Sequence, residues 1–416
     1  MITEEFEDER SEFRDALRRL LEKHAANDWA RSPQTPAGGY DRQLWTLLTQ
    51  QVEVAGLAIP ESFGGSGFGY LECHLVLAEL GRAVVASPFL ASSVLATQAL
   101  LLTAAGSATA GSAAEGSVGE GWAAEGSVAA AQLLPELAAG DRTAALVWDS
   151  DTSNRDSLVA TRVGESWTVD GRARLVLDGA RADLLLAVAK TRPNTHPNTA
   201  PSPAPNSPPE KQSDPGSALF LLDVTHSGLH REPLPTMDQS LHLAEVRCHA
   251  VRARRLGAVE APVRSRLADL AATAITAEQV GGARRCLELT VEYVQHRVQF
   301  GRPIGSFQAI KHRLADLLVL IESADSASQA AAQAWTDDAP DASALASLAK
   351  SYCSQAYRAV TAEAIQLHGG IGFTWEHQAH RYFKRAHSTS TLFGDPSYHR
   401  RRLADHLGLT GQRGPT

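Results

Sequence analysis

The strongest constraint in this sequence is a short turn between two long amphipathic patterns. Before the turn, apolar residues recur at spacings of four, three and four: Leu287, Val291, Val294 and Val298. After it, a second apolar face follows at helical spacing: Ile310, Leu314, Leu317, Leu318 and Ile321. The connection contains Gly301, Pro303 and Gly305, residue types that end helices and form turns. The sequence therefore predicts two long helices joined by a tight connection.

The polar residues of the same turn could cap the helix or bind a ligand. Arg297 falls in the last turn of the first predicted helix, where a cation suits the helix dipole. Its guanidinium also offers a planar fork of donors that suits a pyrophosphate. Gln308 can supply an amide from the start of the second helix. The residues alone leave two interpretations open, a helical hairpin with a capping arginine and a ligand-binding turn.

A second glycine-containing stretch closes a later helical pattern. It reads Gln366-Leu-His-Gly-Gly370. Glycines at positions 369 and 370 let a backbone approach a ligand closely. A glycine C-cap is the other interpretation, because many helices end in this way.

In this order within a helical C-terminal region, the two stretches resemble the acyl-CoA dehydrogenase family. Members of that family carry Arg-x-x-Phe-Gly, a glutamine at the start of the next helix, and Gln-x-x-Gly-Gly. The resemblance implies that these segments reach across a subunit interface to the FAD of a neighbouring chain. The residues it assigns to cofactor binding are Arg297, Gln299, Phe300, Gln308, Gln366, Leu367, His368, Gly369 and Gly370.

The order of patterns along the chain is helices, short strands, then helices. Together with the resemblance it predicts an α+β fold of the acyl-CoA dehydrogenase type. We expect an N-terminal helical domain at 1–142, a central β-barrel domain at 143–259 and a C-terminal four-helix bundle at 260–416. Residues 103–130 contain a duplicated Ala-Ala-Glu-Gly-Ser-Val unit and are interpreted as a low-complexity insertion. Residues 192–216 are rich in proline and are interpreted as a disordered loop.

Composition limits the other classes of function. The 416 residues carry a formal net charge of −8 and a pI near 6.0, which favours neither nucleic acid nor an anionic membrane as a partner. No apolar run reaches the ~18 residues of a membrane span. The four cysteines, Cys73, Cys248, Cys286 and Cys353, form no Cys-x-x-Cys pair, so we expect neither a metal site nor a disulfide framework. The acidic N-terminus lacks a signal-peptide pattern, and a cytoplasmic location is expected.

The residue that should perform the chemistry is not evident. The reaction implied by the resemblance needs a carboxylate that removes a proton beside the thioester carbonyl. Aligned with the family, the two usual positions of this base hold Phe393 and Ala271. Asp395 is a weak candidate base, and a turn residue is the favoured interpretation. Asp269 matches a family position that contacts substrate, and a solvated helix position is its alternative.

The half of the flavin site that a chain builds for itself also departs from the family. The expected Thr-Glu-Pro-x-x-Gly-Ser stretch reads Val147 to Ser153 without the proline and glycine. A Trp-Ile-Thr-Asn stretch is replaced by Leu175 to Gly179. The chain therefore matches the family in the residues that reach a neighbour's flavin and departs from it in its own half of the flavin site. This combination resembles actinobacterial members that form α2β2 heterotetramers, in which one subunit type carries a degenerate site.

The expected function is therefore that of an FAD-dependent acyl-CoA dehydrogenase subunit in fatty acid or steroid catabolism. The implied partners are an acyl-CoA substrate, an electron-transfer acceptor and a paralogous or identical subunit in a tetramer. Two alternatives remain open. One is a non-catalytic subunit that lends residues to the flavin of its partner, and the other is a flavin-dependent monooxygenase on the same fold.

Overall fold

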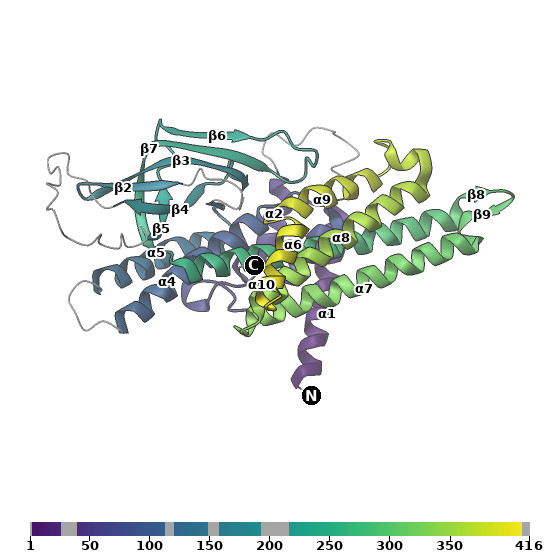
Figure 1. Cartoon of the computed structure of the whole chain (residues 1–416), viewed down its shortest axis with the longest axis horizontal. Coiled ribbons are helices and arrows are strands. Elements are labelled where there is room, and N and C mark those ends of the chain that lie inside the picture. Colours follow the sequence, from purple (N-terminus) through teal and green to yellow (C-terminus); the bar gives the residue numbers. More distant parts are fainter. Residues whose placement is uncertain (1, 26–39, 113–119, 149–157, 193–215, 410–416) are drawn as a thin grey trace, which may run out of the picture.

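Helices from both ends of the chain pack together, and a small sheet formed by the middle of the chain lies on one side of them (Figure 1). The computed structural model describes residues 2–25, 40–112, 120–148, 158–192 and 216–409. The N-terminal elements are α1 (Ile2–Ala25), α2 (Arg42–Gln51), η1 (Val54–Gly56), η2 (Glu61–Phe63), α3 (Tyr70–Ala83), the π-helical η3 (Phe89–Ala96), α4 (Thr97–Ser112) and α5 (Glu120–Ala138). The apolar pattern of α1 buries Leu17 and Leu21 in the largest core cluster, as its helical spacing predicts.

The central strands form a closed, barrel-like sheet. They are β1 (Ala144–Val147), β2 (Val159–Val163), β3 (Ser166–Leu177), β4 (Leu184–Arg192), β5 (Ser217–Leu222), β6 (Leu229–Pro233) and β7 (Leu243–Ala258). The order is β1-β4-β2-β3-β7-β5, with β6 on β7, and β5 also pairs with β4. That last pairing closes the sheet, so few edges stay unpaired. Its interior is a separate apolar cluster that includes Val169, Phe220 and Val251.

The C-terminal region is a bundle of long helices. Its elements are α6 (Ala261–His296), the two-residue strands β8 (Val298–Gln299) and β9 (Arg302–Pro303), η4 (Ile304–Ser306), α7 (Gln308–Thr336), α8 (Ala342–His368), η5 (Gly369–Phe373), α9 (Ala379–Thr391) and α10 (Pro396–His406). The predicted tight connection is thus a small hairpin, β8–β9, at one end of the molecule (Figure 1). The predicted fold class is confirmed. The division into three domains stays a prediction, although the sheet's strands lie between Ala144 and Ala258.

The duplicated segment is largely helical, in contrast to the linker that its composition suggested. α4 continues to Ser112 and α5 begins at Glu120, and these two helices pack against each other. The high helix propensity of the alanine residues offsets the lower propensity of the interspersed glycine and serine residues. Residues 113–119 lie outside the described part of the chain, as do residues 193–215, which cover most of the predicted proline-rich loop.

Two glycines in the middle of α6 allow close helix packing. A Cβ atom on Gly281 would lie 1.8 Å from the carbonyl oxygen of Ala78 in α3, and one on Gly282 would lie 2.4 Å from the hydroxyl of Tyr357 in α8. α6 therefore packs closely on the backbone of α3 at Gly281 and on a side chain of α8 at Gly282. Within the described residues, no helix is both long enough and apolar enough to cross a membrane.

Candidate functional site

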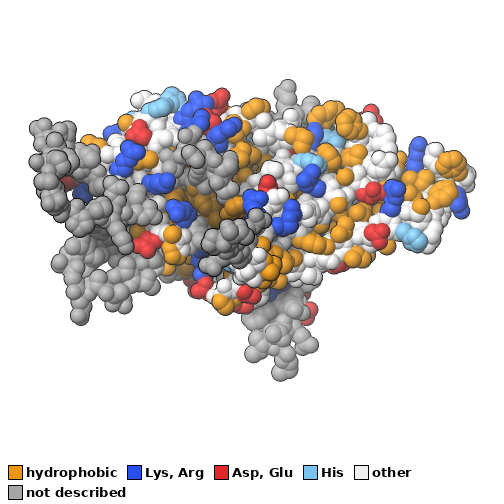
Figure 2. Space-filling model, in the orientation of Figure 1, with side chains coloured by type: hydrophobic (Ala, Val, Ile, Leu, Met, Phe, Trp, Pro, Cys, Tyr) orange, Lys and Arg blue, Asp and Glu red, His pale blue; other side chains and the backbone are white. Residues whose placement is uncertain are grey.

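The residues predicted to bind the cofactor form one exposed surface, which we call the distal surface. It consists of Arg297, Gln299, Phe300, Gln308 and Gln366–Gly370. Arg297 ends α6, and its carbonyl accepts a hydrogen bond of 2.8 Å from the Ile304 amide, which fixes the hairpin. Its side chain is exposed and has no partner within the part of the chain that the structure describes. Phe300 is 92% exposed, and Figure 2 shows apolar and basic side chains together at this tip.

The second half of the distal surface is the end of α8. Gln366, Gly369 and Gly370 are exposed, whereas Leu367 and His368 are buried beneath them. Gly369 has a φ of +63°, a conformation that side chains disfavour. A Cβ atom on Gly370 would meet nothing within 4 Å, so the space above this backbone is open. The ring of Tyr293, one turn before Arg297, lies 4.5 Å from that of His368 and so joins the two halves.

The distal surface lies far from the sheet of the same chain. In Figure 1 the β8–β9 hairpin is at one extreme of the long axis, and the sheet is at the other. A ligand held between the sheet and the bundle of one chain could therefore not reach the distal surface of that chain. A second chain is needed to bring both surfaces to one ligand.

The region that should hold the reacting groups is filled by apolar side chains. Phe393 and Trp148 are 8% and 7% exposed, and their ring centroids are 6.4 Å apart. Ala271, on α6, is fully buried in the same cluster. Neither usual base position offers a proton acceptor. Residues 149–153 of the expected flavin stretch lie outside the described residues.

A buried charged network occupies the adjacent space, and the sequence patterns did not reveal it. The Arg385 guanidinium is 2% exposed and bonds the carboxylates of Asp238 at 2.8 Å and Glu278 at 2.5 Å. It also donates to the Ser240 hydroxyl at 2.8 Å. Burial alone would lower the pKa of Arg385, but the two carboxylates raise it above its usual value. Burial raises the pKa of Glu278, and the Arg385 guanidinium opposes that rise.

This network leaves little room beside the altered flavin stretch. Leu177 and Asp178, within the stretch 175–179, line a cavity of about 20 Å³ together with Glu278 and Arg385. A volume of this size holds about one water molecule. This cavity beside Leu177 is too small for a three-ring system.

Both candidate aspartates make structural contacts. The exposed Asp395 caps α10, because its carboxylate accepts a hydrogen bond of 2.7 Å from the Tyr398 amide. Asp269 is 6% exposed and forms an ion pair with Arg402 of α10. In this arrangement neither carboxylate is free, and their catalytic and substrate-binding roles stay predictions.

The loop that carries Phe393 is held rigidly from below. The Lys350 ammonium donates to the carbonyls of Thr389, Ser390 and Gly394, each at 3.1 Å. Burial lowers its pKa to about 7. The His399 imidazole bonds the Phe393 carbonyl at 2.8 Å. These contacts fix a loop that contributes packing and no carboxylate at position 393.

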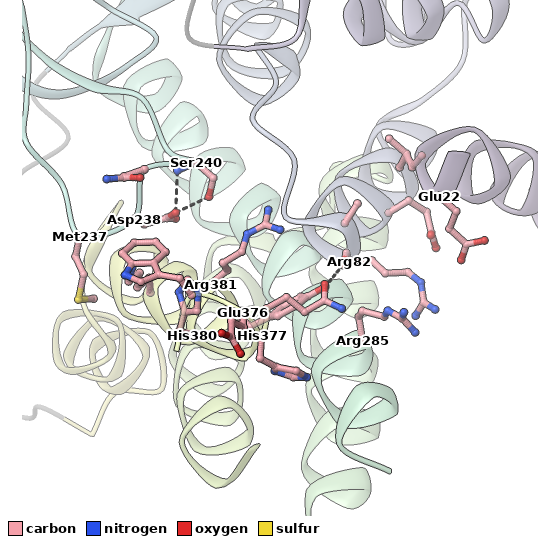
Figure 3. Close-up of a pocket in the computed structure, with 18 of the residues that line it drawn as sticks. Glu22, Arg82, Met237, Asp238, Ser240, Arg285, Glu376, His377, His380 and Arg381 are labelled. Carbon is pink, nitrogen blue, oxygen red and sulfur yellow. Dashed lines mark hydrogen bonds between the residues drawn. The ribbon is translucent and has the colours of Figure 1, made fainter. Parts of the chain in front are cut away.

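A large cavity of about 830 Å³ lies between the N-terminal helices, the β6–β7 connection and the start of α9 (Figure 3). Much of its charge is already paired. Arg18 bonds Glu79 at 2.6 Å, Arg82 bonds Glu288 at 2.6 Å, and the lining residue Asp238 belongs to the Arg385 network. Its electrostatics therefore favour no single class of ligand, and we assign it no role.

FAD, the cofactor that the resemblance implies, fits one of these two regions and not the other. At the distal surface, an unpartnered guanidinium, exposed amides and an open glycine backbone fit a dinucleotide approached from outside. In the described central region, the 20 Å³ cavity does not fit an isoalloxazine ring. The distal surface therefore has the chemistry of one wall of a flavin site, whereas the cavity beside Leu177 does not fit the ring.

Comparison with known proteins assigns the chain to a protein family. The family description "Acyl-CoA dehydrogenase, C-terminal domain" matches residues 262–408, and "Acyl-CoA dehydrogenase, N-terminal domain" matches residues 7–110. The chain belongs to the acyl-CoA dehydrogenase family, whose members are oxidoreductases and generally depend on FAD.

Among its relatives is the acyl-CoA dehydrogenase IpdE2 of Mycolicibacterium smegmatis. It is 35% identical over 95% of this chain and 98% of its own length. Two solved structures are similar. One, a variant of the "Tcur3481-Tcur3483 steroid ACAD", has a TM-score of 0.76 at 27% identity and covers 97% of this chain and 98% of its own. The other, the ChsE4-ChsE5 complex of Mycobacterium tuberculosis, has a TM-score of 0.76 at 26% identity and covers 98% of each chain.

Proposed function

We propose that this chain is one subunit of a heterotetrameric, FAD-dependent acyl-CoA dehydrogenase that introduces an α,β double bond into an acyl-CoA. Its distal surface lends Arg297, Gln308 and Gln366–Gly370 to FAD held in the central site of a paralogous partner. When bound, FAD supplies the acceptor for the β-hydride. The carboxylate that takes the α-proton then comes from the partner. An electron-transfer acceptor would serve as the redox partner of the complex.

The observation that carries the proposal is the contrast between the two ends of the chain. Arg297 and the Gly369–Gly370 backbone are exposed and open, as a shared ligand requires. Phe393 and Trp148 pack together where the chain would need a base and a flavin ring. Two identical chains would combine open distal surfaces with two closed central sites. A partner with an open central site resolves that mismatch.

The relatives suggest both the assembly and the substrate. Two similar structures are named for pairs of different chains, and one of these names includes a steroid. We therefore propose a bulky, steroid-derived acyl-CoA as the substrate. A cytoplasmic location, where acyl-CoA thioesters are made and used, completes the proposal.

The test is to purify the chain alone and together with a paralogue encoded beside it. We expect little flavin in the chain alone and one FAD per pair of different chains in the complex. Under anaerobic conditions, steroid acyl-CoA should bleach the flavin of the complex and leave the isolated chain unchanged. Rapid bleaching of the isolated chain would refute the heteromeric proposal. Flavin that consumes substrate only with oxygen would instead identify a monooxygenase.

A further inference from the structure

Three aromatic rings in contact with one another lie beneath the exposed backbone at the end of α8. Tyr293 of α6 stacks on His368, with 4.5 Å between ring centroids and 27° between ring planes. His377, in the segment before α9, lies on His368 with 4.3 Å between centroids. Tyr293 and His377 are 6.4 Å apart at their centroids, so all three rings are in mutual contact. We call these three residues the aromatic clamp.

Each ring of the clamp is also fixed by a hydrogen bond. The Tyr293 hydroxyl donates to the carbonyl oxygen of His368 at 3.2 Å. His368 Nδ1 lies 2.7 Å from the carbonyl oxygen of Ala364, one turn earlier, so Nδ1 carries the proton and donates. His377 Nδ1 accepts from the Ala379 amide at 3.2 Å, at the start of α9. The clamp thereby ties α6, α8 and α9 together at one point.

The hydrogen bond from Tyr293 holds the peptide between His368 and Gly369, and the orientation of this peptide determines the direction of the glycine backbone that follows. The His368 carbonyl is among the last carbonyls of α8, which have no partner within their helix. Its peptide leads directly to Gly369, whose φ of +63° and ψ of −142° form a conformation that is accessible essentially to glycine alone. On its other side the same peptide donates its Gly369 N–H to the carbonyls of Gln366 and Ile365. Without the Tyr293 hydroxyl the peptide is held on that side alone, and the backbone at Gly370 would adopt a wider range of directions.

We propose that Tyr293 and His377 are positioning residues that set the geometry of Gln366–Gly370 for the partner's FAD. The inference rests on the proposed function and extends it to residues that do not reach the cofactor themselves. A segment lent across an interface has to be rigid before assembly, because ordering it on binding would cost affinity. The clamp provides that rigidity within this chain, with His368 as its buried centre, 3% exposed.

The test compares variants of this chain in the complex with its paralogue. Tyr293→Phe keeps the ring and removes only the hydroxyl, and we expect the Kd for FAD to rise roughly three- to tenfold. His377→Leu removes the stacked ring and should have a similar or larger effect, whereas His377→Phe should restore most of the affinity. Assembly is followed by size and mass, and FAD binding by flavin fluorescence and circular dichroism.

Tyr398→Phe is the matched control. This tyrosine of α10 touches His399 edge-on at 5.0 Å, and its hydroxyl has no partner among the described residues. The control should bind FAD as the unmodified chain does. Unchanged Kd and flavin spectrum in Tyr293→Phe and His377→Leu would overturn the clamp, as would loss of the tetramer in these variants, which indicates general stability instead of positioning. If Arg297→Ala also retains FAD, the proposed function itself fails.

Discussion

Trp148 and Phe393 are in contact across the boundary between the sheet and the bundle, with ring centroids 6.4 Å apart and planes inclined at 50°. Phe393 has a φ of +60° and is buried in the same cluster as Ala271. The loop below it is bonded by Lys350 and His399. Phe393, which the resemblance aligns with the family's base, is therefore part of the apolar core. Restoring a carboxylate there would not restore a catalytic site.

The first prediction concerns Phe393→Glu. We expect no acyl-CoA-dependent flavin bleaching by the isolated chain, because the ring of Trp148 packs against the side chain at position 393 and occupies the space in front of it. The buried carboxylate finds no hydrogen-bonding partner in this apolar cluster, so the free energy of unfolding should fall by at least about 2 kcal/mol. Phe393→Leu is the control, since it keeps an apolar side chain and the same backbone strain. Dehydrogenase activity of the isolated Phe393→Glu chain would show that position 393 can reach a bound substrate, which contradicts its assignment to the apolar core.

The second prediction concerns Arg297→Ala in the assembled complex. A guanidinium on a pyrophosphate is a charge-assisted interaction worth roughly 1.5–3 kcal/mol, so FAD should dissociate at least tenfold more readily. Arg302→Ala is a matched control on the same hairpin, because the Arg302 guanidinium lies 4.1 Å from the centroid of the Phe307 ring of its own chain. Flavin-to-protein ratios after gel filtration measure the effect. Equal retention by both variants would remove Arg297 from the flavin site.

Local sequence patterns predicted most of the helices and the order of the helical and β regions. They did not predict contacts between residues that are far apart in the sequence. The long β7 shows no continuous apolar pattern, because charged residues on its exposed face, such as Arg247 and Arg252, interrupt it. The distal surface was predictable because each of its halves is one continuous motif.

The Arg385 network had no such signal. Its carboxylates are 147 and 107 residues away in the sequence, so only the fold brings them together. The same holds for Tyr293 and His377 around His368. Periodicity identifies faces of helices, but it gives no information on which side chains from separate elements share one buried position.

The third prediction separates the two roles of Asp395. As an N-cap it accepts from the Tyr398 amide, and asparagine can accept the same bond. Asp395→Asn should therefore leave both stability and the activity of the complex unchanged, whereas Asp395→Ala should lower the free energy of unfolding by about 1 kcal/mol. Urea denaturation and steady-state rates of both variants provide the measurement. If Asp395→Asn abolishes turnover, Asp395 is the catalytic base, and the base does not come from the partner subunit.

The fourth prediction concerns the pH dependence of stability and rests on His74. This imidazole is 8% exposed, its Nε2 lies 3.0 Å from the Ser328 hydroxyl, and burial lowers its pKa to about 4. An unfolded chain takes up a proton on this residue near pH 6.5, whereas the native chain does so only near pH 4. Between these values the unfolded state binds more protons, so the free energy of unfolding falls as the pH falls, by up to about 1.4 kcal/mol per pH unit.

Urea unfolding at pH 7.5, 6.5, 5.5 and 5.0 measures this slope, and His74→Gln should reduce it. His399, whose pKa burial also lowers to about 4, keeps part of the slope in that variant. His406→Gln, at an exposed position in the last turn of α10, should leave the slope of the unmodified chain. The linkage argument fails if His74→Gln and His406→Gln give the same pH dependence, because proton uptake by His74 on unfolding would then not contribute to it.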